Sequence, residues 1–413
     1  MSPNLRIAYR FLTAKKRAMF MSLSCTVLGV GLFIVTQATT SGFEQFFTKK
    51  ILGINGAIRV QDRFQDTMRS MAAAGSSDFY FSQRDGVKYI DGVEEPQRMM
   101  AALREFENVR GVSAVLKANA VLTSSFTTKD AQVLGIRLED HVRVSDLEDQ
   151  ITNGTIEDFR HMPSGALVGR VLADHLRLAI DDTFIIAVRG EARRVKVSAI
   201  YETGISDVDK VNVYVHLPMA RSLMKKPAGA TYIQVMVHDP ERAQQDAMKM
   251  EEVLNHRAED WKWRERSWLD VFRALRVSTT ITVSVFTLIA SLAMFNTLAM
   301  IVLEKTKDIA ILRSMGYERR DITQIFLWQA AIVLAIGAAL GSLFGWTVTA
   351  IVEQVPLQIS GIFKSDHFLV VRNVDHYLSA IGTAVVMVMI ASLIPARRAA
   401  RLEPGDIVRG TAQ

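Results

Sequence analysis

The residues that decide the fold run from Val277 to Gln324, and they open with VSTTITVSVFTLIASLAMFNTLAMIVL (277–303) followed by EKTKDIAILRSMG (304–316). The first stretch carries no charged side chain. An α-helix rising about 1.5 Å per residue would be about 40 Å long over this stretch, which exceeds the roughly 30 Å hydrocarbon core of a bilayer. The sequence therefore predicts a transmembrane helix over 277–303 that extends beyond the membrane as a stalk.

The segment that follows, 304–321, has the pattern of a short amphipathic helix. Its apolar residues Ile309, Leu312 and Met315 recur at helical spacing and so share one edge. Its charged residues fall mostly elsewhere on the helical wheel: Lys305, Lys307, Asp308 and Arg313. The pattern predicts a helix whose apolar edge is available to a partner protein, and a plain connecting loop is the alternative.

Two further signals mark where this segment ends. Gly316 is suited to a helix C-cap. Asp321 and Gln324 have the spacing of a capping box at the start of the next helix, where a second apolar run opens at Ile322. The segment is thus predicted to lie between two membrane spans.

The composition limits the class of protein. The chain of 413 residues is 49% hydrophobic with a mean hydropathy of +0.16, while 22% of its residues are charged. It is too apolar for an ordinary soluble protein and too charged to lie wholly within a membrane, so we expect a few spans plus a sizeable aqueous domain. Cys25 is the only cysteine, which excludes an intrachain disulfide.

Three more uncharged runs complete the predicted membrane part. The basic segment 1–17 precedes the run 18–43, which we interpret as a span rather than a signal peptide because signal-peptide apolar regions cover only about 7–15 residues. Further runs cover 322–352 and 377–396, and none of membrane length occurs in 44–276. The predicted fold class is a membrane protein with four transmembrane α-helices and a large α+β extracytoplasmic domain inserted between helices 1 and 2.

The inserted domain carries mixed patterns. Runs rich in β-branched residues predict strands over Val112–Leu116, Thr183–Val188, Val195–Tyr201, Val211–Val215 and Tyr232–Val237. Helical patterns cover Pro96–Phe106, Val171–Leu176 and Glu241–His256.

The distribution of basic residues predicts the orientation. Four spans place both termini on one side of the membrane. The three segments on that side, 1–17, 304–321 and 397–413, contain five, five and four Lys or Arg residues, whereas the opposite loop 353–376 contains two. Because cytoplasmic segments carry the excess of Lys and Arg, both termini are predicted to be cytoplasmic and 44–276 to lie outside.

Two features within the spans predict helix packing. Gly337, Gly341 and Gly345 are four residues apart and so lie on one face, where small residues let two helices approach closely. Asn296 is a polar residue in the second span whose amide must be satisfied, and we interpret it as an interhelical hydrogen-bonding group rather than a transport site.

Several kinds of chemistry have no motif here. The sequence holds no GxxxxGK[ST], HExxH, CxxC or GxSxG pattern, and its eight histidines lack ligand spacing. The spans contain no Asp, Glu, Lys or Arg, which ion-coupled carriers use near the membrane midplane. We therefore expect no catalytic residue, metal, cofactor or nucleic-acid partner for this chain.

Short motifs spread along the chain carry a family resemblance. They read AYRFL (8–12), SGFE (41–44), ILGING (51–56), VGRVLA (168–173) and PARRAA (395–400), together with the segment 304–316. In this order and topology the chain resembles the FtsX/MacB-type permeases of ABC systems, most closely the lipoprotein-releasing (LolC/LolE-type) branch.

The resemblance implies a mechanotransmission permease in the bacterial inner membrane. A separate dimeric ATPase chain would bind ATP and Mg and grip the segment 304–316, and a second permease subunit would complete either a homodimer or a heterodimer. The residues implied in coupling to the ATPase are Glu304, Lys305, Lys307, Asp308, Ile309, Leu312, Met315 and Gly316.

The resemblance also implies a substrate. A lipoprotein would be extracted from the outer leaflet of the inner membrane and given to a periplasmic carrier, with its acyl chains held between the first two spans among membrane lipids. Candidate contacts by position are Phe33, Ile34, Gln37, Phe272, Leu275 and Phe286. The alternatives are an efflux or envelope-stress permease for another amphiphile or peptide, and an FtsX-like relay that regulates a cell-wall enzyme.

One segment departs from that branch. Its carrier-recruiting members insert a protruding hook between two strands of the outer domain. Here the predicted strands that end at Val188 and begin near Val195 are joined by 189–194 alone, which is too short for an extended hook. Carrier recruitment by this subunit is therefore left open.

Overall fold

The structure is a computed structural model that describes residues 3–14, 16–62, 92–355, 357–359, 363–365 and 368–401. The chain forms two compact units. The helical unit comprises 1–45, 270–356 and 367–413, and the sheet unit comprises 46–269 and 357–366. Of the predicted cytoplasmic tail 397–413, the part beyond 401 lies outside the described residues.

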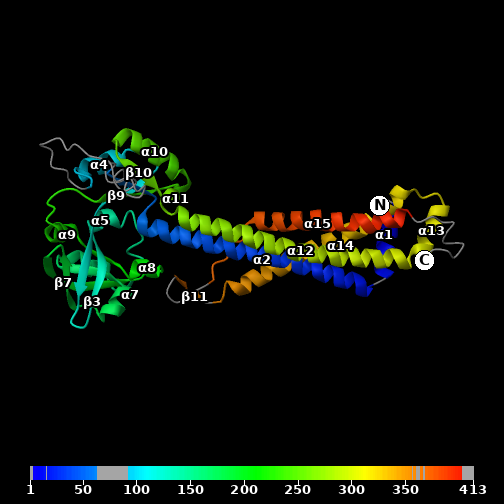
Figure 1. Cartoon of the computed structure of the whole chain (residues 1–413), viewed down its shortest axis with the longest axis horizontal. Helices are drawn as coiled ribbons and strands as arrows, with labels where there is room; N and C mark the ends of the chain where they lie inside the picture. Colours follow the sequence, from blue (N-terminus) through cyan, green and yellow to red (C-terminus); the bar gives the residue numbers. More distant parts are fainter. Residues whose placement is uncertain are drawn as a thin grey trace, which may run out of the picture. The chain divides into compact units, whose positions relative to one another are not determined.

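Within the described part of the helical unit, four helices are long and apolar enough to cross a membrane. They are α2 (Lys16–Asn55), α12 (Arg266–Glu304), α14 (Arg319–Val352) and α15 (Val374–Ala400), and two short helices accompany them, α1 (Pro3–Ala14) and α13 (Thr306–Ser314). The long helices run alongside one another in this unit (Figure 1). Most residues of each apolar window remain uncovered by the chain itself, as expected where lipid covers a helix. Each predicted span falls inside one of these helices, and the number of membrane crossings remains a prediction.

The corner between α13 and α14 is closed by two local motifs. Gly316 has φ 96°, and the N–H groups of Gly316 and Tyr317 donate to the carbonyls of Arg313 and Leu312, both at 3.2 Å, which forms a Schellman motif. The capping box of α14 joins Glu318 and Asp321. The predicted box of Asp321 with Gln324 is therefore wrong by one turn, because α14 begins at Arg319.

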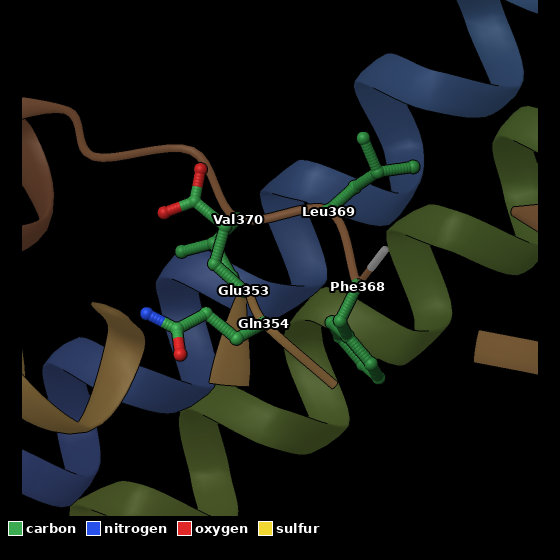
Figure 2. A pocket seen from close by; sticks show the side chains of 5 residues that line it. All are labelled: Glu353, Gln354, Phe368, Leu369 and Val370. Carbon is green, nitrogen blue, oxygen red and sulfur yellow. The ribbon is translucent and has the colours of Figure 1, made fainter. Parts of the chain in front are cut away.

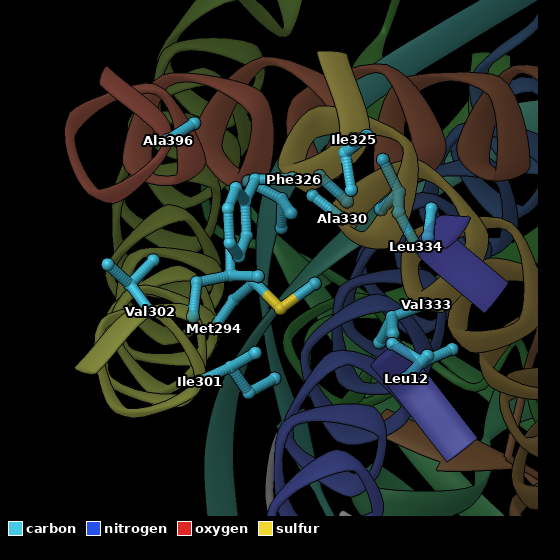
Figure 3. Packing of buried hydrophobic residues seen from close by; sticks show 14 of the residues in the cluster. Leu12, Met294, Ile301, Val302, Ile325, Phe326, Ala330, Val333, Leu334 and Ala396 are labelled. Carbon is cyan, nitrogen blue, oxygen red and sulfur yellow. The ribbon is translucent and has the colours of Figure 1, made fainter. Parts of the chain in front are cut away.

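The apolar core of the helical unit lies where α1, α12, α14 and α15 meet. Figure 3 shows Met294 and Ile301 of α12 packed in this cluster with Phe326 of α14, which is fully buried. Ala396 of α15 and Leu12 of α1 belong to the same cluster. The core thus gathers residues that are far apart in the sequence.

The sheet unit is an α+β domain. Its strands are β1 (Ile58–Gln61), β2 (Val109–Thr123), β3 (Thr128–Ile136), β4 (Ile151–Gly154), β5 (Gly165–Gly169), β6 (Thr183–Val188), β7 (Glu191–Tyr201), β8 (Asn212–His216), β9 (Tyr232–Val237) and β10 (Arg257–Asp260). Its helices are α4 (Pro96–Arg104), α5 (Leu138–His141), α6 (Ile156–His161), α7 (Arg170–Leu176), α8 (Ser206–Asp209), α9 (Leu217–Met224), η1 (Pro240–Arg242), α10 (Ala243–Leu254) and α11 (Trp261–Arg264). A separate two-stranded sheet pairs β11 (Leu357–Ile359) with β12 (Phe363–Ser365).

The described strands of the main sheet follow the order β10-β1-β9-β2-β3-β8-β5-β7-β4, with β6 paired to β2 and β7. The pairs β3–β8 and β5–β7 are parallel, and the other pairs along this order are antiparallel. All six residues of β9 are buried, which is typical of a strand in the interior of a covered sheet. The five strands predicted from sequence are confirmed, with β2 much longer than the segment Val112–Leu116.

The β6–β7 hairpin is tighter than predicted. Strand β7 begins at Glu191 rather than near Val195, so only Arg189 and Gly190 connect it to β6. Both have positive φ, 49° and 90°, as a two-residue turn of type I′ requires. The correction strengthens the conclusion that no extended hook is inserted between these strands.

Candidate functional site

The short helix α13 presents a different face from the one predicted. Ile309 is only 1% exposed and joins the core of the helical unit, and Leu312 is half-buried against that core. Ile311 and Met315 are 58% and 73% exposed. Of the predicted apolar edge, Ile309 is covered by the chain's own core, Leu312 is half-buried and Met315 is exposed, and contact of this edge with a partner stays a prediction. Periodicity identified residues that share a face, but the chain's own core covers most of that face.

The charged residues of α13 also divide into two groups. Lys305 Nζ pairs with an Asp308 carboxylate oxygen at 2.7 Å and lies 5.4 Å from the centre of the Phe11 ring of α1. Lys305 and Asp308 thus contribute to contacts within the chain. Glu304 and Lys307 are exposed, as is Gly316, which has open space around its Cα. We name the surface formed by Lys307, Ile311, Met315 and Gly316 the coupling face.

Helix α1 forms the second wall beside α13. A groove of about 540 Å³ lies between them, lined by Ile7, Arg10, Phe11, Lys305, Asp308, Ile311 and Leu312. Asn4 Nδ2 donates to Asp321 Oδ1 at 3.3 Å and to Gln324 Oε1 at 3.1 Å, which ties α1 to the first turns of α14. The sequence interpretation missed this helix. The buried pair Ala8 and Leu12, four residues apart, was the signal that could have found it.

The three glycines of α14 lie against α2. Each is buried, and a Cβ atom built on it would lie 2.7 to 3.0 Å from the nearest side-chain atom of α2. Gly337, Gly341 and Gly345 face Thr26, Val30 and Ile34 respectively. The four-residue spacing of the glycines on α14 therefore matches the four-residue spacing of their neighbours on α2. The close approach is thus made to a helix of the same chain.

The candidate substrate contacts on α2 and α12 separate by burial. Phe33, Ile34 and Phe272 are buried by the chain itself, and their contact with the acyl chains of a substrate stays a prediction. Gln37 Nε2 donates to Thr280 Oγ1 at 3.0 Å and is used in helix pairing. Only Leu275 and Phe286 are exposed, at 47% and 44%. Their sequence positions put these residues on α2 and α12, as the structure shows, but did not indicate which of them face the inside of the helical unit and which face outward.

Further contacts hold α2 and α12 together along this stretch. The rings of Phe43 and Phe272 meet edge to face with centroids 5.7 Å apart, and Arg276 forms an ion pair with Glu44. With the bond between Gln37 and Thr280, they form a continuous series of contacts between the two helices. The two helices therefore behave as one packed pair here.

A chain segment crosses α2 at the far end of the helical unit from α13. Figure 2 shows Phe368 and Leu369 pointing to opposite sides of this segment, beside Glu353 and Gln354 at the end of α14. These residues and Val370 line a pocket of about 370 Å³. The N–H of Val371 donates to the Ala38 carbonyl of α2 at 3.1 Å, and Arg372 pairs with Glu353.

The crossing requires a glycine on α2. A Cβ atom on Gly42 would lie 2.1 Å from the Leu369 carbonyl oxygen. Ser41 Oγ is also hydrogen-bonded to His376 Nε2 at 3.1 Å. Segment 368–372 is thus fixed against α2, and its pocket is a surface hollow rather than an enclosed site.

The sheet unit buries ionisable groups without gathering them into a metal site. No group of three or more His, Cys, Asp or Glu side chains suited to a metal occurs in the parts of the chain that the structure describes. Burial raises the pKa of Asp209 to about 6, although this carboxylate accepts hydrogen bonds from the Thr203 N–H and hydroxyl. Burial lowers the pKa of His141 to about 4. Both groups serve the packing of the domain.

Comparison with known families accounts for both units. Residues 19–253 match the family described as "MacB-like periplasmic core domain", and residues 280–404 match that described as "FtsX-like permease C-terminal". The chain therefore belongs to the MacB- and FtsX-like family of ABC-transporter permeases. It is a membrane subunit of that superfamily.

Individual proteins similar to this chain share only a low sequence identity with it. "Lipoprotein-releasing system transmembrane protein LolC" of Xylella fastidiosa (strain 9a5c) is 25% identical, over 98% of each chain. The corresponding protein LolE of Haemophilus influenzae is 22% identical, over 92% of this chain and 91% of its own. The solved periplasmic region of MacB from Actinobacillus actinomycetemcomitans is 12% identical with a TM-score of 0.35, and it covers 52% of this chain and 94% of that one.

Proposed function

We propose that this chain is a permease subunit that transmits motion from a separate ATPase, and that it extracts lipoproteins from the outer leaflet of the inner membrane. The full-length similarity to proteins named for lipoprotein release supports the substrate class. In this proposal ATP and Mg bind to the ATPase dimer, and a second permease subunit completes the membrane part. Both termini face the cytoplasm and 44–276 lies in the periplasm, as the bias of Lys and Arg indicates.

The observation that carries the proposal is the exposed coupling face of α13. Its apolar residues Ile311 and Met315 are four apart and stand outside the core. An exposed apolar pair beside Lys307 on the cytoplasmic side suits a groove on a protein partner, and we assign that groove to the ATPase. The burial of Ile309 beneath them anchors the same helix in the bundle, so a displacement of α13 would move the bundle with it.

Helix α12 is the proposed path of the motion. It ends at Glu304, and α13 begins two residues later at Thr306. A displacement of the coupling face would therefore be transmitted directly to α12. Helix α12 is also tied to α2 by the pair of Gln37 and Thr280 and by that of Phe43 and Phe272. The two helices would therefore move as a pair. Their exposed residues Leu275 and Phe286 are the remaining candidates for contact with an acyl chain.

Substitution of the coupling face tests the ATPase assignment. A carboxylate placed at Ile311 or Met315 must lose its water on docking, and even a few kcal/mol would lower the docking constant by orders of magnitude. Ile311→Glu and Met315→Glu should each abolish co-purification of the ATPase while the permease still inserts and keeps its melting temperature. The matched control is Arg319→Ala, at an exposed position of the next helix, which should retain the ATPase.

Equal recovery of the ATPase from all three variants would refute the coupling role of α13. Leu312→Glu is a poorer test because Leu312 is half-buried, so its effect on folding would be confused with docking. The substrate is tested separately. Proteoliposomes that hold the permease, its ATPase and a triacylated lipoprotein should release the lipoprotein only with ATP. ATP hydrolysis without release would remove the lipoprotein assignment and leave the ATPase assignment intact.

A further inference from the structure

A hollow lies between α12 and α15, close to the carboxyl ends of both helices. Its volume is about 190 Å³, which is room for roughly six groups the size of a water molecule. The described residues that line it are Phe295, Ala299, Val302, Leu303, Thr306, Pro395 and Arg398. None of them belongs to the coupling face or to the candidate contacts for an acyl chain on α2 and α12, so the hollow is a separate feature.

The walls of this hollow are apolar except for two side chains. The Thr306 hydroxyl donates to the carbonyls of Val302 and Leu303, at 3.0 and 2.7 Å, and so is already satisfied. Arg398 is exposed, and its side chain forms no hydrogen bond or ion pair within the part of the chain that the structure describes. The hollow therefore has apolar walls and a single guanidinium group that is free to bind a ligand.

The position of the hollow along the helices places it at the boundary between hydrocarbon and headgroups. Phe295 lies nine residues before Glu304, the first charged residue after the uncharged run of α12, which is about 13 Å along the helix. Arg398 follows Arg397, the first charged residue after the uncharged run of α15. Long basic side chains near the ends of a span reach the membrane interface. One end of the hollow thus lies at the depth of acyl chains and the other at that of phosphates.

The charge around Arg398 is positive. Arg397 and Arg401 are four residues apart on α15, both are exposed, and neither side chain pairs with an acid in the described ranges. A guanidinium can donate two parallel hydrogen bonds to a phosphate. Basic pockets between transmembrane helices are typical binding sites for anionic lipid headgroups. A soluble protein suits the hollow less well, because Phe295 lies too deep for it to reach.

We propose that this hollow binds one anionic phospholipid, with the lipid phosphate on Arg398 and part of an acyl chain against Ala299 and Phe295. Arg397 and Arg401 favour a headgroup of net negative charge over a zwitterionic one. Thr306 is the first residue of α13, so the bound lipid contacts the junction between α12 and α13. Binding of the lipid requires no ATPase, and it can be measured on the permease alone.

Lipid titration of the delipidated full chain in a neutral detergent tests the charged end. Native mass spectrometry should show dioleoylphosphatidylglycerol bound more tightly than dioleoylphosphatidylcholine. Arg398→Gln should weaken binding of phosphatidylglycerol roughly five-fold, the factor that one arginine contributes near an anionic headgroup. The matched control is Arg6→Gln on α1, which removes the same charge at an exposed position outside the hollow and should leave binding unchanged. Equal affinity for the two lipids, or equal binding by the two variants, would overturn the proposal.

A second pair of variants tests the apolar end. Ala299→Phe places a ring in the hollow without changing the charge, so it should also weaken binding of phosphatidylglycerol. Ala293→Phe, at a half-exposed position of α12 that does not line the hollow, should retain it. The melting temperature of each lipid-free variant checks its folding, and Arg398→Gln decides the matter if the ring at 299 lowers that temperature.

Glycerol 3-phosphate, which has the phosphate but no acyl chain, should not displace phosphatidylglycerol from the unsubstituted chain. Displacement by this compound, or full binding by a folded Ala299→Phe variant, would show that the hollow does not hold a lipid. Loss of the ATPase from the coupling-face variants concerns the proposed function alone and leaves these lipid measurements unchanged.

Discussion

Replacement of Gly341 by alanine tests whether the close packing of α14 on α2 stabilises the helical unit. The added Cβ would lie 2.9 Å from Val30 Cβ and 3.0 Å from the Val27 carbonyl oxygen. Ordinary van der Waals contact for such an atom is 3.4–4 Å. The two helices must therefore separate by several tenths of an ångström, and the glycines at 337 and 345, which have similar clearances, would lose contact with α2 as well.

Two opposing free-energy terms decide whether Gly341→Ala stabilises or destabilises the helical unit. Alanine in place of glycine inside a helix is favourable by about 1 kcal/mol. Overpacking of a tight interface typically costs about 1–3 kcal/mol, and here the obstructing atoms include backbone, which cannot rotate away. Gly341→Ala should therefore be destabilising by up to about 2 kcal/mol, and Gly341→Leu by clearly more. No hydrophobic gain compensates the loss, because lipid is as apolar as the side chains.

Gly382 of α15 provides the matched control, because a Cβ added there would meet no atom within 4 Å. Gly382→Ala should keep only the favourable helix term. Thermal unfolding of the detergent-solubilised chain should therefore rank Gly382→Ala at or above the unsubstituted protein and Gly341→Ala below it, with Gly341→Leu lowest. A melting temperature for Gly341→Ala as high as that of Gly382→Ala would show that the glycine stripe reflects composition and not packing.

Three further predictions concern orientation, pH and the hairpin. Ser125→Cys in the β2–β3 turn should react with an impermeant thiol reagent in spheroplasts and Ser314→Cys on α13 should not; the reverse pattern would invert the topology. Because the pKa of Asp209 is raised to about 6, its contribution to the free energy of unfolding falls by roughly 3 kcal/mol as pH rises from about 4 to 6. Because the pKa of His141 is lowered to about 4, its contribution to the free energy of unfolding falls by a similar amount as pH decreases from 6.5 to 4. The two effects oppose each other, so Asp209→Asn should make the melting temperature rise with pH across this range and His141→Phe should make it fall; parallel profiles would contradict the shifts. Arg189→Asn should stabilise the sheet unit by roughly 0.5–1 kcal/mol in thermal unfolding, because asparagine tolerates the positive φ of this turn better than arginine, and no gain would count against strain at Arg189.

The features that depend on local pattern and length could be predicted from the sequence alone. Four uncharged runs were long enough for membrane spans, and each lies within a single long helix. Runs rich in β-branched residues, such as Thr183–Val188 and Tyr232–Val237, became strands with those bounds. The four-residue spacing of Gly337, Gly341 and Gly345 predicted a common face, and the structure brings them together against α2. In each case the decisive information is the distance along one chain segment, which the sequence contains.

The side of each helix that is covered depends instead on how the whole bundle packs. Ile309 and Ile311 are both apolar residues of one short helix, yet the first is buried and the second exposed, because only one side of α13 packs into the core of the helical unit. Likewise Phe272 packs against Phe43 while Phe286 stays exposed on the same helix. Periodicity specifies residues that point in the same direction, but the neighbour they meet is contributed by segments hundreds of residues away, such as α1 beneath α14. That placement depends on the packing of the whole bundle, and no local pattern encodes it.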